Sequence, residues 1–90
     1  MTIPRLEDLR TQIDRLDNQL VELLARRFRL TDEIGRLKRG LGLPAIDEER
    51  EQQQRTKIQQ SARQHGLSEE IALKVLRAII DAVVINHRNV

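Results

Sequence analysis

Cysteine is absent from this 90-residue sequence, so disulfides and thiolate metal sites are excluded. Phe28 is the only aromatic residue, which leaves few large side chains to fill a hydrophobic core. Two histidines, His65 and His87, do not by themselves make a zinc site, so no metal site is expected. A chain this small without such cross-links is expected to gain stability by association with another chain.

Long hydrophobic runs are missing as well. No apolar run approaches the roughly 20 residues that span a bilayer. The N-terminal stretch MTIPRLEDLR lacks the apolar segment of a secretion signal. The net charge is only +2 although 33% of residues are charged, and the two signs are interspersed, which argues against a nucleic-acid role. We therefore expect a cytoplasmic protein that binds neither membranes nor nucleic acid.

Prolines and glycines are few, and their positions divide the chain into three helices. The predicted helices cover residues 4–39, 47–65 and 69–88. Pro4 suits a first helical turn, Gly40, Gly42 and Gly66 suit helix ends, and Ser68 is a good N-cap. The third helix is apolar on nearly every side and should be the most buried. The sequence predicts an all-α fold in which residues 1–90 form a single domain.

Apolar residues recur along the first helix in alternating steps of three and four, so they form one continuous seam on its surface. The seam consists of Leu6, Leu9, Ile13, Leu16, Leu20, Leu23, Leu30, Ile34 and Leu37. Arg27 takes the one position of this pattern that is charged. A buried guanidinium without a partner is costly, so Arg27 must meet an anion, either a carboxylate of the protein or a bound ligand.

The length of the first helix predicts a dimer. A helix of about 35 residues is roughly 50 Å long, whereas a compact monomer of this size has a diameter of about 30 Å. The third helix could cover only about 30 Å of the apolar seam. A second chain is expected to cover the remainder, in a two-fold homodimer built on paired long helices.

Further cations share the first helix with Arg27. Lys38 lies on nearly the same face, about 16 Å farther along, so the two side chains could hold a small dianion between them. Arg10 lies about 25 Å from Arg27 on another face, but in an antiparallel dimer the partner's Arg10 could reach the site. The basic stretch from Arg26 to Arg39 can also be explained by cations that complement a helix C-terminus.

The second helix carries a stripe whose first half is polar: Asp47, Glu51 and Gln54, before Ile58 and Ala62. A solvent-exposed face explains this pattern as a whole, and Asp47 is also a good N-cap without any ligand. Alternatively, the polar half of the stripe lines a polar site.

These residues together resemble the AroQ-type chorismate mutases over nearly the whole chain. The resemblance is carried by LRTQIDRLDNQLVELLARRFRLTDEIGRLK, by DEERE, and by the apolar third helix. It combines Arg10, Arg27, Lys38, Asp47, Arg50 and Glu51 at the spacing of the family. It implies an intertwined all-α homodimer with two equivalent active sites, which rearrange chorismate to prephenate on the route to phenylalanine and tyrosine. No cofactor is implied.

The resemblance also implies roles for individual side chains. Arg27, together with Arg10 of the neighbouring subunit, would hold the two substrate carboxylates, and Lys38 would contact a carboxylate and the ether oxygen. Asp47 and Glu51 would bind the C4 hydroxyl. Arg50 would complete the cationic wall of the same site.

Two positions of the third helix depart from the family pattern. The family usually places a Ser or similar residue, and one turn later a Gln or Glu, near the ether oxygen. Val83 and His87 stand at these positions here. Val83 could simply be core, whereas His87 lies on the stripe that faces inward and is assigned to the site.

Other functions remain open on the same sequence. An isochorismate-pyruvate lyase or an aminodeoxychorismate mutase could use the same scaffold, although Asp47 and Glu51 suit a C4 hydroxyl. A noncatalytic helical dimerisation module, with Arg27 paired to a carboxylate, is the alternative from another class. The sequence identifies no regulatory enzyme partner.

Overall fold

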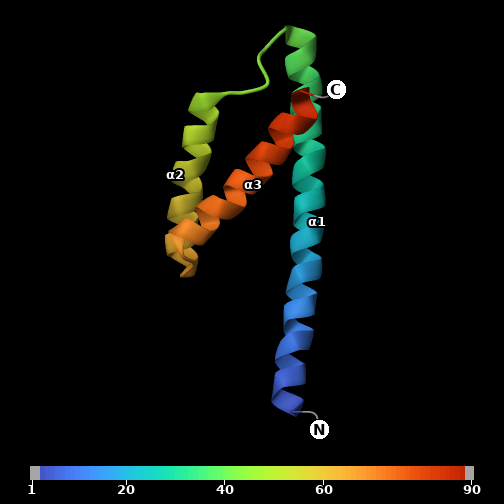
Figure 1. Ribbon diagram of the computed structural model, residues 1–90, viewed down its shortest axis with the longest axis vertical. Coiled ribbons are helices and arrows are strands. Elements are labelled where there is room, and N and C mark those ends of the chain that lie inside the picture. The colour runs from blue at the N-terminus through green and yellow to red at the C-terminus, as the bar shows by residue number, and fades with distance from the viewer. Residues whose placement is uncertain (1–2, 89–90) are drawn as a thin grey trace. The chain divides into compact units, whose positions relative to one another are not determined.

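The structure, a computed structural model, describes residues 3–88 and the side chains of residues 3–86. It contains three α-helices: α1 (Pro4–Leu41), α2 (Glu48–His65) and α3 (Glu69–Arg88) (Figure 1). The predicted all-α class is confirmed, and the three helix ranges agree with the prediction to within two residues at each end. Within the described residues, no helix is both long and apolar enough to cross a membrane.

The first helix continues two residues beyond the predicted end because Gly40 remains helical. Gly42 is the residue that leaves the helix, with a left-handed φ of 69°. The N–H groups of Gly42 and Leu43 then donate to the carbonyls of Arg39 and Lys38, at 3.2 and 2.8 Å. This pair of hydrogen bonds satisfies carbonyls that the helix end leaves open, so α1 stops at Leu41.

The second helix begins and ends as the sequence predicts. Asp47 is its N-cap, since Oδ1 accepts a hydrogen bond from the N–H of Arg50 at 3.0 Å. Gly66, with a φ of 70°, closes the C-terminus in the same way as Gly42. Ser68 then caps α3, because its Oγ accepts from the N–H of Ile71 at 3.3 Å.

The chain forms two compact units, one ending at Thr31 and the other starting at Asp32. The first unit holds most of α1. In the second unit α2 and α3 pack against each other, and their contact buries Ala62, Ala72, Leu76 and Ile80. Most of these buried residues belong to α3, as predicted, while Ile71, Val75 and Ile85 on the same helix remain exposed.

Candidate functional site

A groove lies in the second unit between α2 and α3, with a volume of about 660 Å³. This volume is within the range of about 300–1,000 Å³ that is typical of small-molecule sites. Five charged side chains line the groove together with three apolar ones. They are Glu48, Glu51, Arg55, Arg77 and Asp81, with Ile46, Val84 and Ile85.

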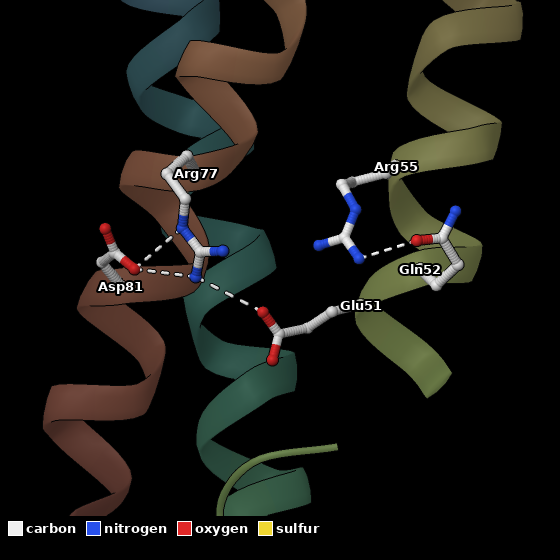
Figure 2. Close-up of polar contacts among 5 residues, drawn as sticks. All are labelled: Glu51, Gln52, Arg55, Arg77 and Asp81. Carbon is white, nitrogen blue, oxygen red and sulfur yellow. Dashed lines mark hydrogen bonds and ion pairs between the residues drawn. The ribbon is translucent and has the colours of Figure 1, made fainter. Parts of the chain in front are cut away.

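Glu51 is the predicted site residue that lines this groove. It lies one turn into α2, and its side chain is only 16% exposed. Its Oε1 accepts a hydrogen bond from Nη2 of Arg77 on α3 at 3.3 Å (Figure 2). A mostly buried carboxylate needs such a partner, because burial without one is costly. The packing of α2 on α3 therefore fixes where the Glu51 carboxylate lies.

Arg77 is itself held by Asp81, one helical turn farther along α3. Nε and Nη2 of Arg77 lie 2.9 and 2.7 Å from Oδ1 of Asp81. The hydrogen bond to Asp81 and the negative charges of Asp81 and Glu51 raise the pKa of Arg77, although partial burial opposes the change. Arg77 is therefore a permanent cation between two carboxylates.

Arg55 is a second cation in the same groove but has a different partner. Its Nη2 donates to Oε1 of Gln52, one turn earlier on α2, at 2.8 Å. Figure 2 shows the Arg55 side chain bonded to Gln52 and not to Glu51. Of the two groove arginines, Arg77 is thus the one that contacts Glu51.

Lys38 and Asp47 lie on either side of the loop that joins α1 to α2. The half-buried Lys38 donates from Nζ to the carbonyl of Ala45 at 3.3 Å. An ammonium group has three donors, so this bond leaves Lys38 able to bind an anion. Asp47 uses Oδ1 to cap α2, and Arg50 in the first turn of α2 is exposed. Lys38, Asp47 and Arg50 are therefore close in sequence to the groove, but they do not line it.

Arg10 and Arg27 belong to the first unit. Arg27 is half-buried, whereas Arg26 and Arg29 beside it are exposed. Within residues 3–31, ion pairing occurs between Arg5 and Asp8 at 3.1 Å, and Arg27 has no such pair. Arg10 is exposed. The carboxylate partner that a purely structural Arg27 would need is therefore not supplied by this segment.

The comparison with known proteins decides the family. Residues 9–88 match the family described as chorismate mutase type II. The chain belongs to the chorismate mutase type II family. The predicted resemblance to all-helical chorismate mutases is confirmed, and with it chorismate mutase function, an isomerase activity.

Individual relatives agree with this assignment. A chorismate mutase of Methanocaldococcus jannaschii is 32% identical over 79 residues, which are 88% of this chain and 80% of the relative. A T-protein of Haemophilus influenzae is 38% identical over 72 residues, and one of Enterobacter agglomerans is 35% identical over 78 residues. These matches cover 80% and 87% of this chain but only 19% and 21% of the two T-proteins. The chain thus spans about a fifth of their length.

Val83 and His87 are the positions where this chorismate mutase family member departs from the expected pattern. Val83 is half-buried on α3 and does not line the groove. His87 lies within α3, but its side chain is outside the described residues, so its assignment to the site stays a prediction. Within the described part of the chain, no three histidine or acidic side chains are grouped as a metal site would require.

Glu51 is the one lining residue that the sequence analysis assigned to the site, and among those it missed, Arg77 and Asp81 form the ion-paired group around Glu51. Both were counted as part of an apolar third helix. Their spacing of four residues was a usable signal, because oppositely charged side chains at that spacing meet on one helix face. The contact between Arg77 and Glu51 joins residues 26 positions apart and depends on how α3 crosses α2, which the spacing does not give.

Proposed function

We propose that two copies of this chain pair along α1 and form two shared sites that rearrange chorismate to prephenate. One observation carries the pairing: the nine apolar residues of the α1 seam are each 40–65% exposed in the single chain. A contiguous apolar surface of this kind marks an interaction site. A second copy presents the same seam and can cover it through a two-fold interface. Residues 1–90 then act as a single chorismate mutase domain within each half of the dimer.

The proposed site assigns a role to each cation and carboxylate. Arg27 of one subunit and Arg10 of the other bind the two substrate carboxylates. Lys38 contacts a carboxylate and the ether oxygen, and Arg50 adds positive charge to the same wall. The half-buried state of Arg27, without an ion pair in its own segment, supports its use by a ligand.

The C4 hydroxyl of chorismate is assigned to Asp47 and Glu51. Glu51 has one oxygen bonded to Arg77, and a carboxylate can accept at the other. Asp47 likewise uses Oδ1 for the helix cap. Val83 and His87 are proposed to face the same substrate from α3, with His87 donating a hydrogen bond to the ether oxygen.

The reaction suits a site that has cations and no nucleophile. In the [3,3] rearrangement one C–O bond breaks while one C–C bond forms within the same molecule. Binding both carboxylates selects the folded conformer in which the reacting carbons are close. Negative charge develops on the ether oxygen as the C–O bond breaks, so fixed donors there stabilise the transition state more than the ground state.

An obligate dimer is the first expected outcome. Sedimentation at micromolar concentration should give twice the chain mass of 10.5 kDa. The midpoint of thermal unfolding should rise with protein concentration, because association stabilises only the folded chain. A stable monomer that remains active would contradict the shared site.

Two substitutions of Asp47 separate its role as the N-cap of α2 from its proposed role in substrate binding. Asp47→Asn keeps a good N-cap, so the free energy of unfolding should stay nearly unchanged, whereas Asp47→Ala should lose about 1 kcal/mol. Asn lacks the negative charge, so kcat/KM for chorismate should fall about tenfold in Asp47→Asn. Chemical denaturation and initial rates measure both quantities. If kcat/KM of Asp47→Asn equals that of wild type, Asp47 caps α2 and has no role in substrate binding.

A substrate panel tests the choice of substrate. Initial rates are measured with chorismate, isochorismate and aminodeoxychorismate at equal enzyme concentration. The highest kcat/KM is expected for chorismate, because Asp47 and Glu51 accept a hydrogen bond from its C4 hydroxyl. A higher value for isochorismate with release of pyruvate, or for aminodeoxychorismate, would assign the chain to the corresponding alternative. If prephenate fails to raise the melting temperature and no substrate reacts, a noncatalytic dimerisation module is favoured.

A further inference from the structure

We propose that Arg77, held in place by Asp81, is a positioning residue that fixes the Glu51 carboxylate for the substrate. The inference rests on the proposed function, since it concerns the step in which Glu51 binds the C4 hydroxyl. Arg77 itself is not assigned a contact with chorismate.

The contacts around Arg77 hold its guanidinium at two points. Nε donates a hydrogen bond to Oδ1 of Asp81 at 2.9 Å, and Nη2 forms an ion pair with the same oxygen at 2.7 Å (Figure 2). Nη2 also donates to Oε1 of Glu51 at 3.3 Å. Because a guanidinium is planar and rigid, the two contacts with Asp81 set the direction in which Nη2 points. The position of Nη2 in turn determines where Oε1 of Glu51 lies.

The exposure of the three side chains shows which one depends on the others. Glu51 is 16% exposed, whereas Arg77 and Asp81 are 51% and 59% exposed. An exposed ion pair contributes little to stability, so the pair between Arg77 and Asp81 adds little to the fold by itself. Glu51 is the partly buried group, and its contact with Arg77 neutralises it on α2. The main effect of this arrangement is therefore to orient the Glu51 carboxylate, and its contribution to the stability of the helix pair is smaller.

The remaining oxygen of Glu51 is where the substrate would bind. Oε1 is taken by Arg77, and the described residues offer no hydrogen-bond donor to Oε2. A hydroxyl that donates to Oε2 would thus meet a carboxylate that is already oriented. Orientation of this kind affects rate strongly, since displacement of a reacting group by about 1 Å can lower activity by about 100-fold.

Arg63 on α2 provides a matched control. It carries the same charge as Arg77 and pairs with Glu69 at 4.0 Å, but it does not line the groove. Arg77→Gln should lower kcat/KM for chorismate by about 10- to 100-fold. Arg63→Gln removes one positive charge outside the groove and should change kcat/KM by less than about twofold, as expected for an exposed pair. Arg77→Lys keeps the positive charge but lacks the planar guanidinium, so its kcat/KM should lie between those of wild type and Arg77→Gln.

A double-mutant cycle separates positioning from a structural role. In a Glu51→Ala background, Arg77 has no carboxylate to place, so adding Arg77→Gln should lower the residual kcat/KM by less than about twofold. If Arg77→Gln lowered kcat/KM equally with and without Glu51, the proposal would be overturned. Wild-type kcat/KM in Arg77→Gln, or an equal defect in Arg63→Gln, would overturn it as well. Should Arg77→Gln fail to fold, Asp81→Asn replaces it in every comparison. Full activity of Asp81→Asn would then overturn the proposal.

A second readout does not depend on turnover. The Nε–H resonance of Arg77, assigned by its loss in Arg77→Lys, should shift in Glu51→Ala and stay in place in Gln52→Ala. If wild type converts chorismate but the Arg77 resonance does not shift in Glu51→Ala, the positioning role is wrong and the proposed function stands. If wild type leaves chorismate unchanged, the proposed function is wrong, and the role of Arg77 in it is lost even where the resonance shifts.

Discussion

Replacing Arg27 by alanine is expected to lower kcat/KM for chorismate by about 100- to 1,000-fold while leaving the helices intact. Arg27 interrupts the apolar seam of α1 and is half-buried, yet it has no ion pair within its own segment. A cation at such a position is costly for the free protein and is useful only when an anion binds. The melting temperature of Arg27→Ala should therefore equal or exceed that of wild type.

The neighbouring Arg26 serves as the control for this change. It carries the same charge on the same helix but is exposed. Arg26→Ala should retain nearly full activity, because an exposed cation outside the site contributes little. If Arg27→Ala unfolds while Arg26→Ala remains folded, Arg27 has a structural role and its assignment to the substrate is wrong.

Mixing two inactive variants is expected to restore activity. Arg10→Ala and Lys38→Ala each damage both sites of their own homodimer. If Arg10 acts across the interface, as proposed, a heterodimer formed by subunit exchange has one site with both changes and one site with neither. Random pairing of equal amounts leaves about a quarter of all sites intact, so about a quarter of wild-type activity should return.

The outcome of mixing depends only on which subunit supplies Arg10. If Arg10 and Lys38 of one chain served the same site, every site in the mixture would carry at least one change. Absence of recovery, with subunit exchange demonstrated by native mass spectrometry, would therefore place Arg10 in the site of its own chain or outside any site.

The helices could be predicted from the sequence because their ends depend on local chemistry. Asp47, Gly66 and Ser68 were identified as caps from residue type alone, and each one forms the predicted cap. The end of α1 was placed two residues too early, because a glycine in the last turn is tolerated at a cost of about 1 kcal/mol, so the helix continues through Gly40 to Leu41.

The arrangement of the site could be predicted only in part. Glu51 was assigned to the site by the resemblance to chorismate mutases, since the polar stripe alone left a solvent-exposed face open; in the structure Glu51 lines the groove. Its partner was not foreseen, because Arg77 reaches it only where α3 packs on α2. Residue type and spacing indicate which side chains share one helix face, whereas a pair on two helices depends on how those helices cross.

Prediction along α1 has the same limit: the sequence shows which residues share a helix face but not what packs against that face. The seam and its interruption at Arg27 follow directly from the helical repeat. Which surface covers Leu16 or Leu20 does not follow from that repeat, since both remain exposed in the single chain. The dimer is accordingly proposed from the exposed seam and the length of the helix.

Analysis of the product formed from chorismate tests the central claim most directly. Purified protein is incubated with chorismate, and substrate and products are separated and identified by chromatography and mass spectrometry. Prephenate should accumulate as chorismate is lost, with the same mass as the substrate and without release of pyruvate, at a rate well above that of a protein-free control. Pyruvate as product, or loss of chorismate no faster than in the control, would contradict the account.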